Sequence, residues 1–544
     1  MRLIVRKTYL DKLERLKGSP DIKVITGMRR SGKSVLIRQF IEAVKATDPH
    51  ANILSVDFTC LEFEVLKDYR ALHAWAKSHY KNGVANYLFV DEVQMCNGFE
   101  SAINSLHATN EFDIYLTGSN AFLLSSDLAT LFTGRSMELK VFPFSFAEYR
   151  QYFEYDQRLD DAFDAYVRKG GLPGSYVYRN ASEQKANLVE TYNTIVQRDL
   201  IEKYHLGNAA AMHCISEYLM DNIGNLTSAN NVCNRLSNKK VEPSHVTAGN
   251  YICHLCNAFI FDECKRYDLK GGKYLERLRK YYLYDHGLRH AVLGARSLDY
   301  GRIYENIVYV ELLRRGYVVC VGKLYEKEVD FVATRGGEKV YIQVSDDISS
   351  AETLERELMP LMRIADAYPK MLIARTHHEE TDRNGVKIVD IVRWLAGDES
   401  GQTTASRIRS RVRRALSEEF VSIADAFSRG RARFNFLANG GRFDVKAADT
   451  SFETIWSEAR EASVCAHKDG VELIGVRDGV SEFPETVDVF ETFDFTRRAS
   501  VCKIGDIVVF MNRDGRFLAV KILDIQAVTH GASKNQLEFD YRIY

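Results

Sequence analysis

Apolar runs alternate with amphipathic stretches over the first 150 residues. Four of the runs have the length of buried strands: DIKVIT (21–26), ANILSVDF (51–58), NYLFVDE (86–92) and FDIYLTGS (112–119). The stretch SVLIRQFIEAV (34–44) has the apolar spacing of a helix instead. Strands that alternate with helices are typical of a parallel sheet covered by helices. The pattern therefore predicts a parallel α/β domain over residues 1–150.

The pattern changes after residue 150. Residues 151–205 are predicted to be helical, with a break at GGLPG (170–174). Three helical stretches and a hairpin follow, at 211–222, 227–237, 244–258 and 259–278, which is the order of a winged helix-turn-helix. The next segment predicts a helix (304–316) followed by the strands KEVDFVA, KVYIQVS and MLIAR. We expect a linker at 397–406, an arginine-rich helix at 407–433 and short strands over 444–544.

One glycine-rich segment indicates nucleotide binding. The pattern GxxxxGKS occurs once, at GMRRSGKS (27–34), directly after a predicted strand and at the start of a predicted helix. In such a loop, backbone N–H groups surround the phosphates, the lysine reaches the β- and γ-phosphates, and the serine hydroxyl binds Mg²⁺. The predicted ATP-binding residues are Gly27, Met28, Arg29, Arg30, Ser31, Gly32, Lys33, Ser34 and Val35.

Polar residues at later strand ends complete this prediction. In LFVDE (88–92), Asp91 is expected to hold Mg²⁺ and Glu92 to position or deprotonate the attacking water. Asn120, or otherwise Ser119, is expected to contact the γ-phosphate or the water; a simple turn is the alternative. Arg135 precedes a further strand and is a candidate arginine finger for a neighbouring subunit's nucleotide, with a structural arginine as the alternative.

A longer series of segments carries a family resemblance. GMRRSGKS, LFVDEVQ, LTGSNAFLL, LFTGR, PFSFAEY and GGLPG are followed by YNTIVQRDL (192–200), YENIVYVELLRRG (304–316) and KEVDFVATRGGEKVYIQVS (327–345). Over about residues 1–396 the chain resembles a group of bacterial and archaeal AAA+ ATPases. In that group a winged helix and a restriction-endonuclease-like domain follow the ATPase module. The resemblance implies ATP hydrolysis, assembly into a hexamer-like ring or spiral, and Arg135 as the finger.

The sequence thus predicts an α/β multidomain chain. The predicted segments are an AAA+ P-loop core (1–150), a helical lid (151–205), a winged helix-turn-helix (206–295), a degenerate restriction-endonuclease-like domain (296–398), an arginine-rich helical linker (399–440) and a β-rich domain of unknown role (441–544).

The winged helix is a candidate DNA-binding module. In this fold the third helix enters the major groove and the wing meets phosphate. The candidate DNA contacts are Lys239, Lys240, Ser244, Lys265, Arg266, Lys270 and Lys273. Packing between subunits is the alternative role. Cys253 and Cys256 in the third helix have no second ligand pair at zinc spacing, so we expect buried thiols.

The restriction-endonuclease-like segment departs from the nuclease pattern. Such nucleases bind Mg²⁺ through a helix carboxylate, a strand Asp and a strand Glu or Asp, with a lysine two residues later. The resemblance matches these positions to Glu305, Asp330, Gln343 and Ser345. Because an amide and a hydroxyl replace a carboxylate and an ammonium, we expect an inactive fold used for assembly or DNA binding. Migration of Lys323 or Lys327 into the lysine role would instead permit cleavage.

Composition and charge limit the alternatives. The 544 residues carry a net charge of −1, which by itself argues against nucleic-acid binding. The value conceals a split: +3 over 205–290, +5 over 407–433 and −6 over 444–544. With ten cysteines and no apolar run of about 18 residues, we expect reduced thiols, a cytoplasmic location and no membrane partner.

These observations lead to one principal hypothesis and two alternatives. The principal hypothesis is an oligomeric, Mg²⁺-dependent AAA+ ATPase that uses ATP hydrolysis to bind, remodel or translocate DNA. An ATP-regulated nuclease acting through Glu305 and Asp330 is one alternative, and a nucleotide-dependent assembly switch without DNA is the other. The acidic segment 444–544 is further expected to cover the basic helix in a resting state.

Overall fold

The structure is a computed structural model, and its described residues form two compact units, within 1–398 and 399–544. The described residues are 3–118, 132, 134–155, 159–237, 243–294, 299–378, 380–397, 429–437, 441–447, 450–459, 463–467, 471, 473–476, 482–484, 493, 499–512, 516–526 and 535–544. The predicted linker at 397–406 lies outside this set except for Gly397. Arg407, Arg411 and Arg414 of the predicted basic helix also lie outside it.

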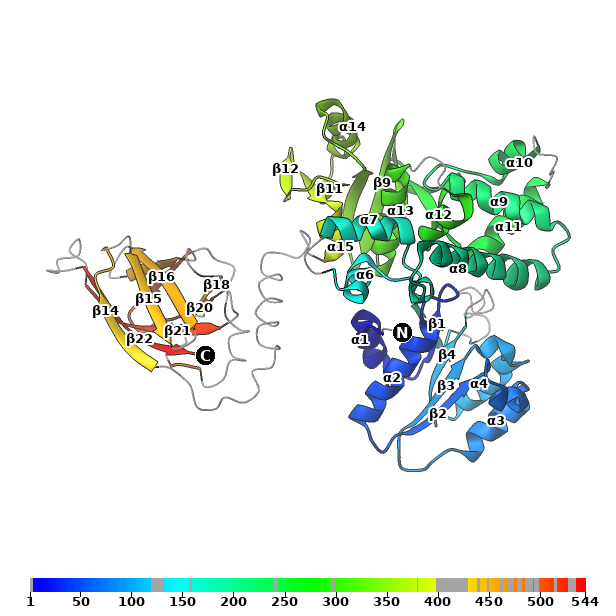
Figure 1. The fold of residues 1–544 in the computed structure, drawn as a ribbon, viewed down its shortest axis with the longest axis horizontal. Coiled ribbons are helices and arrows are strands. Elements are labelled where there is room, and N and C mark those ends of the chain that lie inside the picture. The colour runs from blue at the N-terminus through cyan, green and yellow to red at the C-terminus, as the bar shows by residue number, and fades with distance from the viewer. Residues whose placement is uncertain are drawn as a thin grey trace. The chain divides into compact units, whose positions relative to one another are not determined.

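The first unit begins with a five-stranded parallel sheet in the order β2-β3-β4-β1-β5, of which Figure 1 labels β2, β3, β4 and β1. Its strands are β1 (Ile22–Thr26), β2 (Asn52–Asp57), β3 (Asn86–Asp91), β4 (Asp113–Thr117) and β5 (Ser136–Lys140). The four strands predicted from apolar runs are confirmed. β1 and β3 are buried along almost their whole length, because helices cover both faces of the sheet.

Two helix pairs cover the two faces of this sheet. The helices are α1 (Lys7–Leu16), α2 (Lys33–Thr47), α3 (Tyr69–Ser78) and α4 (Phe99–Ala108), with short 3₁₀ turns at Leu61–Leu66 and Val93–Met95. Apolar residues of α1 and α2 share a core with Ile25 and Phe89, while those of α3 and α4 share another with Val24 and Val90. Neighbours in one strand point to opposite faces, so the two cores are separated by the sheet.

The chain next forms a series of helices that follow the five-stranded sheet in sequence. They are α6 (Phe146–Phe153), α7 (Leu159–Lys169), a 3₁₀ turn (Pro173–Val177), α8 (Ala181–Thr194), a π-helical turn (Ile195–Glu202), α9 (Ala209–Asp221), α10 (Ala229–Ser237) and α11 (His245–Asn257). The helix break predicted at GGLPG is present, since α7 ends at Lys169 and the 3₁₀ turn begins at Pro173.

The hairpin after α11 joins a mixed eight-stranded sheet in the order β12-β13-β11-β10-β9-β8-β6-β7. The strands are β6 (Phe261–Asp268), β7 (Lys273–Leu283), β8 (Val318–Leu324), β9 (Lys327–Arg335), β10 (Glu338–Ser345), β11 (Lys370–Ala374), β12 (Thr381–Arg383) and β13 (Val386–Asp390). The accompanying helices are α12 (Gly287–Leu293), α13 (Tyr300–Arg314), α14 (Ala351–Met362) and α15 (Ile391–Ala396). The hairpin predicted as a wing is therefore an edge of the sheet of the following segment, through the parallel pairing of β6 with β8.

The second unit contains two antiparallel sheets with one shared core. Their orders are β14-β22-β21-β20-β18 and β15-β16-β17-β19. The strands are β14 (Arg429–Phe434), β15 (Arg442–Ala447), β16 (Thr450–Glu458), β17 (Ser463–His467), β18 (Leu473–Val476), β19 (Ala499–Lys503), β20 (Ile507–Met511), β21 (Phe517–Gln526) and β22 (Gln536–Ile543). The β-rich prediction for this part is confirmed.

The prediction of helix through residue 433 is wrong at its described end. Arg429–Phe434 is the strand β14, which pairs antiparallel with β22. Arg431 and Arg433 are exposed on either side of buried Ala432, and this alternation has the period of a strand. Arg431 binds Asp540 and Arg433 binds Glu538 across the pair. The segment is rich in arginine, but its exposed and buried positions alternate as a strand requires.

Candidate nucleotide-binding site

The phosphate-binding loop connects β1 to α2, and two of its glycines are required by geometry. Gly27 has φ +138°, and a Cβ at this position would lie 2.2 Å from the Val141 carbonyl oxygen. Gly32 has φ +97° and directly precedes α2. Only glycine adopts such backbone conformations without strain, so the two residues let the loop turn closely around its centre.

Lys33 is buried at the start of α2 and points back into the loop. Its Nζ donates to the carbonyl oxygens of Gly27 (2.9 Å) and Met28 (3.0 Å). Burial lowers the pKa of Lys33 to about 8, although the carboxylates of Glu92 and Asp91 oppose this shift. The ammonium is therefore held by weak partners in a dry loop, where an anionic phosphate would be a stronger partner.

Asp91 and Glu92 lie at the carboxyl end of β3, next to the end of β4. Burial raises the pKa of Asp91, while hydrogen bonds from Thr117 and Ser34 oppose that rise. The Thr117 hydroxyl donates to Asp91 Oδ1 and accepts the backbone N–H of Glu92 at 3.0 Å. Glu92 has φ +54°, and its carboxylate accepts a bond from the Gln94 amide. One threonine thus orients both predicted acidic residues.

Thr117 was missed by the sequence analysis, which placed the polar contact at Asn120 or Ser119. Both of those residues lie outside the described residues. The position of Thr117 in the sequence could have identified it, because Thr117 ends β4, the strand that pairs directly with β3. In a parallel sheet the carboxyl ends of neighbouring strands meet at one edge, where ligands bind.

A cavity of about 260 Å³ opens beside the loop. Lys33, Ser34 and Glu92 line one side of it, and residues from the segment after the sheet line the other. The remaining lining residues are Leu3, Ile4, Arg6, Arg30, Gly32, Val35, Phe144, Tyr152, Pro173 and Gly174. Pro173 and Gly174 belong to GGLPG, so this break in the helices is a wall of the site.

Arg6 holds the loop from the amino-terminal side. Its guanidinium donates to the Ser31 carbonyl (3.0 Å), to the Phe142 carbonyl (2.9 Å) and, through Nε and Nη2, to both oxygens of Glu148 (2.7 and 3.0 Å). Burial by itself lowers the pKa of Arg6, but the Glu148 carboxylate raises it above its ordinary value. Glu148 also caps α6 with Ser145, so this ion pair joins the loop to the start of the helical segment.

The two arginines of the loop extend toward the helical segment. Arg29 lies 3.6 Å from Asp199, and Arg30 Nη1 donates to the Thr191 hydroxyl at 3.2 Å. Burial raises the pKa of Asp199, whereas Arg29 opposes the rise. Asp199 lies in YNTIVQRDL, a segment to which the sequence analysis assigned no role.

The candidate finger, Arg135, lies elsewhere on the module. It is exposed and immediately precedes β5, while its backbone N–H and carbonyl bond to Phe132 and Ile22. It does not line the cavity of its own chain. Its side chain is accordingly accessible to another molecule.

The endonuclease-like residues form a second buried cluster. Glu305 of α13 and Asp330 of β9 lie close together, and the cation between them is Lys280 of β7. Lys280 Nζ lies 2.8 Å from Glu305, 2.7 Å from Glu328 and 3.7 Å from Asp330. Burial opposes the charge on Lys280, but these carboxylates raise its pKa. Burial and the Glu305 carboxylate raise the pKa of Asp330 well above its usual range.

The amide and the hydroxyl of the degenerate pattern have other partners. Gln343 Oε1 accepts the Asp330 backbone N–H at 3.3 Å, and its Nε2 donates to Glu357 at 3.1 Å. The Ser345 hydroxyl donates to the Asp347 carbonyl at 3.0 Å. Among the described residues no group of three or more His, Cys, Asp or Glu side chains is arranged to hold a metal ion. The lysine that enters the cluster is neither Lys323 nor Lys327, and no spacing rule relates Lys280 to Glu305.

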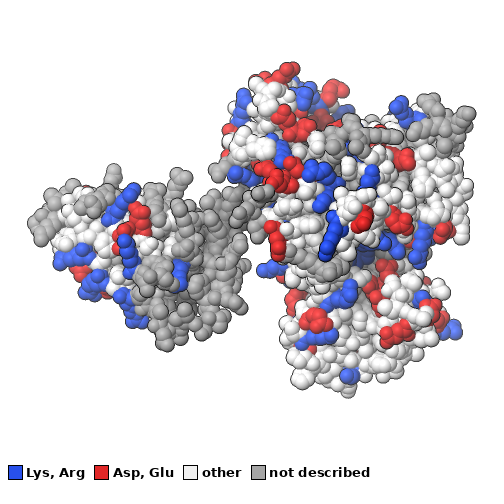
Figure 2. All heavy atoms as spheres, viewed as in Figure 1, with Lys and Arg blue, Asp and Glu red and all other residues white. Residues whose placement is uncertain are grey.

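The predicted DNA contacts are dispersed. Lys239 and Lys240 lie outside the described residues, and the Ser244 hydroxyl accepts the Thr247 N–H (3.1 Å) as the cap of α11. Lys265, Lys270 and Lys273 are exposed on the β6–β7 hairpin, and Arg266 is half-buried there. Basic and acidic side chains are interspersed over the face shown in Figure 2. The exposed basic residues of this set that the structure describes therefore all lie on the β6–β7 hairpin.

The two cysteines of α11 differ from each other. Burial raises the pKa of the Cys256 thiol well above its usual value. Cys253 is exposed, so the expectation of a buried thiol is wrong for this residue. Cys253 and Cys256 are three positions apart on one helix, and α11 buries only the face that contains Leu255 and Ile252.

Comparisons with known proteins identify the family. A family model described as an AAA domain matches residues 19–150, and a model of a domain of unknown function matches 160–299. An uncharacterized protein of Haemophilus influenzae is 35% identical over 398 residues, which is 72% of this chain and 98% of that protein. The chain belongs to this family of AAA-domain ATPases.

Two further proteins are similar to this AAA ATPase. An uncharacterized protein of Methanocaldococcus jannaschii is 27% identical over 358 residues, covering 62% of this chain and 77% of that protein. A solved structure of a Walker-type ATPase from Pyrococcus abyssi is 16% identical to this chain and has a TM-score of 0.37. The match covers 53% of this chain and 95% of the solved chain.

No helix in the described part of the AAA ATPase is long and apolar enough to cross a membrane.

Proposed function

We propose that this AAA ATPase hydrolyses Mg²⁺-bound ATP as an oligomer and uses the reaction to bind and remodel, or move along, DNA. The observation that carries the proposal is the convergence of Lys33, Ser34, Asp91 and Glu92 at one edge of the parallel sheet, beside the cavity. These side chains are the types that phosphoryl transfer to water requires.

The residues present fit a magnesium ion. The Ser34 hydroxyl and the Asp91 carboxylate are in hydrogen-bonding contact, and such hard oxygen donors are the ligands that Mg²⁺ takes together with phosphate oxygens. When bound, the ion neutralises charge that develops on the phosphates. Asp91, oriented by Thr117, is assigned to its shell and Ser34 to direct ligation.

The chain's own residues supply the remaining steps. Lys33 exchanges two carbonyl partners for the β- and γ-phosphates, which gives an ammonium in a dry loop a charged partner. Glu92 holds the attacking water in line with the γ-phosphate and accepts a proton from that water. The Thr117–Glu92 backbone bond keeps Glu92 in its left-handed conformation, facing the cavity.

Arg135 is assigned to a neighbouring subunit's site. It is exposed and lines no part of its own nucleotide cavity, as a finger that acts on a neighbouring subunit's nucleotide requires. This role requires an oligomer, in which the guanidinium adds positive charge to the transition state. DNA binding is assigned to the β6–β7 hairpin, where Lys265, Lys270 and Lys273 are exposed.

The nuclease alternative is disfavoured by the cluster around Lys280. An ammonium in contact with the carboxylates of Glu305 and Glu328 already supplies the positive charge that a divalent ion would bring. Gln343, bonded to the Asp330 backbone and to Glu357, adds no charge. The two carboxylates that survive from the nuclease pattern are therefore assigned to an internal ion-pair network.

The decisive experiment combines two site variants with a DNA series. Lys33→Ala should lose nucleotide binding, and Glu92→Gln should bind ATP without turnover; normal hydrolysis by Glu92→Gln contradicts the assigned base. Mixing Arg135→Ala with Glu92→Gln subunits should restore part of the turnover, and absence of rescue at every ratio contradicts the trans finger.

ATP hydrolysis is then measured with duplex, forked and single-stranded DNA beside a cleavage assay. A rate indifferent to all three DNAs contradicts the DNA role.

A further inference from the structure

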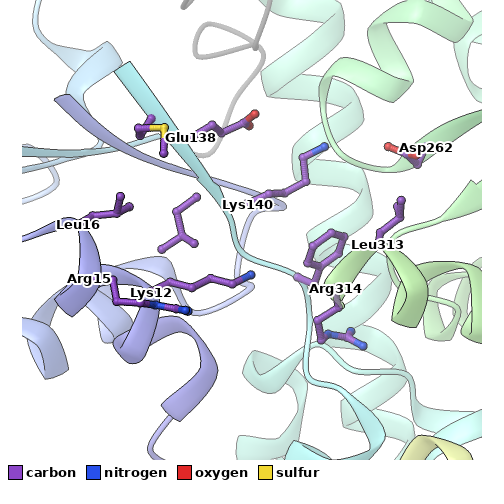
Figure 3. A pocket seen from close by; sticks show the side chains of 11 residues that line it. Lys12, Arg15, Leu16, Glu138, Lys140, Asp262, Leu313 and Arg314 are labelled. Carbon is purple, nitrogen blue, oxygen red and sulfur yellow. The ribbon is translucent and has the colours of Figure 1, made fainter. Parts of the chain in front are cut away.

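A second cavity, of about 430 Å³, shares no lining residue with the nucleotide cavity (Figure 3). It is bordered by α1, by the edge strand β5, by β6 and by the end of α13, all within the first unit. Its lining residues are Lys12, Arg15, Leu16, Met137, Glu138, Leu139, Lys140, Phe142, Asp262, Leu313 and Arg314. Cations from three separate elements therefore surround one cavity.

Three of these cations have no carboxylate partner among the described residues. Lys12 makes no hydrogen bond there, Arg15 Nε donates to the backbone carbonyl of Asp11 at 3.2 Å, and Lys140 Nζ donates to the Tyr284 hydroxyl at 3.2 Å. Burial and the charge of Arg15 lower the pKa of Lys12. These three cations therefore form no ion pair among the described residues.

The acidic residues of the cavity are already engaged. Asp262 accepts hydrogen bonds from the Tyr284 hydroxyl (2.6 Å) and the Tyr309 hydroxyl (2.5 Å), and Glu138 accepts one from Thr26 (2.5 Å). Both carboxylates keep their negative charge, so the lining carries four cationic side chains against two carboxylates, and one of the four, Arg314, is paired with Glu311. The lining therefore keeps a net positive charge, which favours an anion.

Arg314 adds a donor without a partner. Its side chain is only 10% exposed, and it binds Glu311 and the Pro143 carbonyl (3.1 Å). Its Nε is buried and has no hydrogen-bond acceptor among the described residues. Buried guanidinium N–H groups are normally satisfied, so this donor is unusual, but no contact in the described part of the chain directs it toward Lys12, Arg15 or Lys140.

We propose that this cavity binds a phosphorylated small molecule of nucleotide size, at a site separate from the phosphate-binding loop. Lys12, Arg15 and Lys140 bind the phosphate group, and the apolar part of the ligand contacts Leu16, Met137 and Phe142. A volume of about 430 Å³ lies in the range of small-ligand sites. Because β5 belongs to the ATPase sheet while α13 belongs to the following segment, the ligand contacts both.

The test uses the full chain carrying Lys33→Ala, which disables the loop, so that only the second site is measured by calorimetry. The probes are pyrophosphate, ADP and a 20-nucleotide DNA strand. Pyrophosphate and ADP should bind to this chain and should bind at least about tenfold more weakly after Lys12→Gln/Lys140→Gln. The matched control is Lys7→Gln/Lys45→Gln, which removes exposed lysines of α1 and α2 and should change nothing. Arg15→Gln, at an exposed position, serves as a second variant.

Three results would overturn the proposal. The first is an Lys33→Ala chain that binds neither pyrophosphate nor ADP, or binds them equally well without Lys12 and Lys140. The second is binding of the DNA strand alone through these lysines, which would make the site part of a nucleic-acid surface. The third is loss of ATP hydrolysis in Lys12→Gln/Lys140→Gln with Lys33 intact, since a separate site predicts a normal basal rate. None of these outcomes bears on the roles proposed for Glu92 and Arg135.

Discussion

Replacing Lys280 by methionine removes the only basic side chain in contact with Glu305, Glu328 and Asp330 in the described structure while keeping similar length and volume. Lys280 is 4% exposed, and the side chains of Glu305 and Asp330 are each 12% exposed. Breaking a buried ion pair by deleting one partner costs about 3–5 kcal/mol, because the other charge stays buried without compensation. Two carboxylates already lie within 3 Å of the ammonium, so we expect the Lys280→Met variant to fall in this range.

The same variant should gain a property that the native chain lacks. With the ammonium removed, the carboxylates of Glu305, Glu328 and Asp330 are left without their cation. In the native arrangement they are not placed to hold a metal ion, so Mg²⁺ or Mn²⁺ binds once their oxygens close in on the space that the ammonium leaves. A divalent ion at a hundredfold excess over its Kd would return about 2.7 kcal/mol. Metal should therefore restore much of the lost stability in Lys280→Met and little or none in the native chain.

The assay is urea denaturation followed by the fluorescence of Trp394, whose ring lies 4.1 Å from the Arg315 guanidinium after α13. Trp75→Phe and Trp456→Phe are introduced so that Trp394 alone reports. Lys323→Met is the matched control, because Lys323 is a half-buried lysine of the same sheet without a salt bridge among the described residues. If Lys280→Met does not fold, the added change Glu305→Gln should recover it by lowering the uncompensated charge.

Two outcomes would refute the reasoning. Equal stabilisation of the native chain and of Lys280→Met by Mn²⁺ would show that the ammonium does not occupy the centre. DNA cleavage by the native chain that depends on metal and disappears in Lys280→Met would make Lys280 a catalytic lysine.

Three further predictions concern the phosphate-binding loop and the segment behind it. Gly27→Ala should abolish ATP binding measured by calorimetry, since its Cβ would lie 2.2 Å from a backbone oxygen at φ +138°; ATP binding within threefold of the native value contradicts this. Arg6→Met should weaken ATP binding by at least about tenfold and cost about 3–5 kcal/mol, with partial recovery in Arg6→Met/Glu148→Gln; additive effects of the two changes would show that the pair is not coupled. Burial raises the pKa of Asp285 to about 7 and lowers that of His286 to about 4. Between about pH 4 and 6.5, folded Asp285 holds a proton that unfolded Asp285 has lost, so the contribution of Asp285 to stability falls as the pH rises. In the same range unfolded His286 holds a proton that folded His286 has lost, so the contribution of His286 rises with pH. Each slope reaches about 1.4 kcal/mol per pH unit, so His286→Asn should expose a fall in unfolding free energy with pH; a flat urea-denaturation profile from pH 4.5 to 7 would argue against it.

The strands and the loop of the ATPase core were determined by local sequence. Buried parallel strands are continuous apolar runs, and GMRRSGKS needs glycine at two positions of positive φ, so both leave signals within a few residues. Asp91 and Glu92 were placed correctly at a strand end for the same reason. The arginine-rich segment shows the limit of local patterns, because composition was given more weight than the period of Arg431 and Arg433.

Tertiary structure alone decided which distant side chains share a site. Thr117 meets Asp91 only because β3 and β4 are neighbours, and Arg6 meets Glu148 across 142 positions. Lys280 reaches Glu305 because the β6–β7 hairpin joins the sheet of the following segment rather than standing apart as a wing. The physical reason is common to all three: burial of a charge is tolerated only with a partner, and the partner's place in the sequence is set by strand order, which no local pattern encodes.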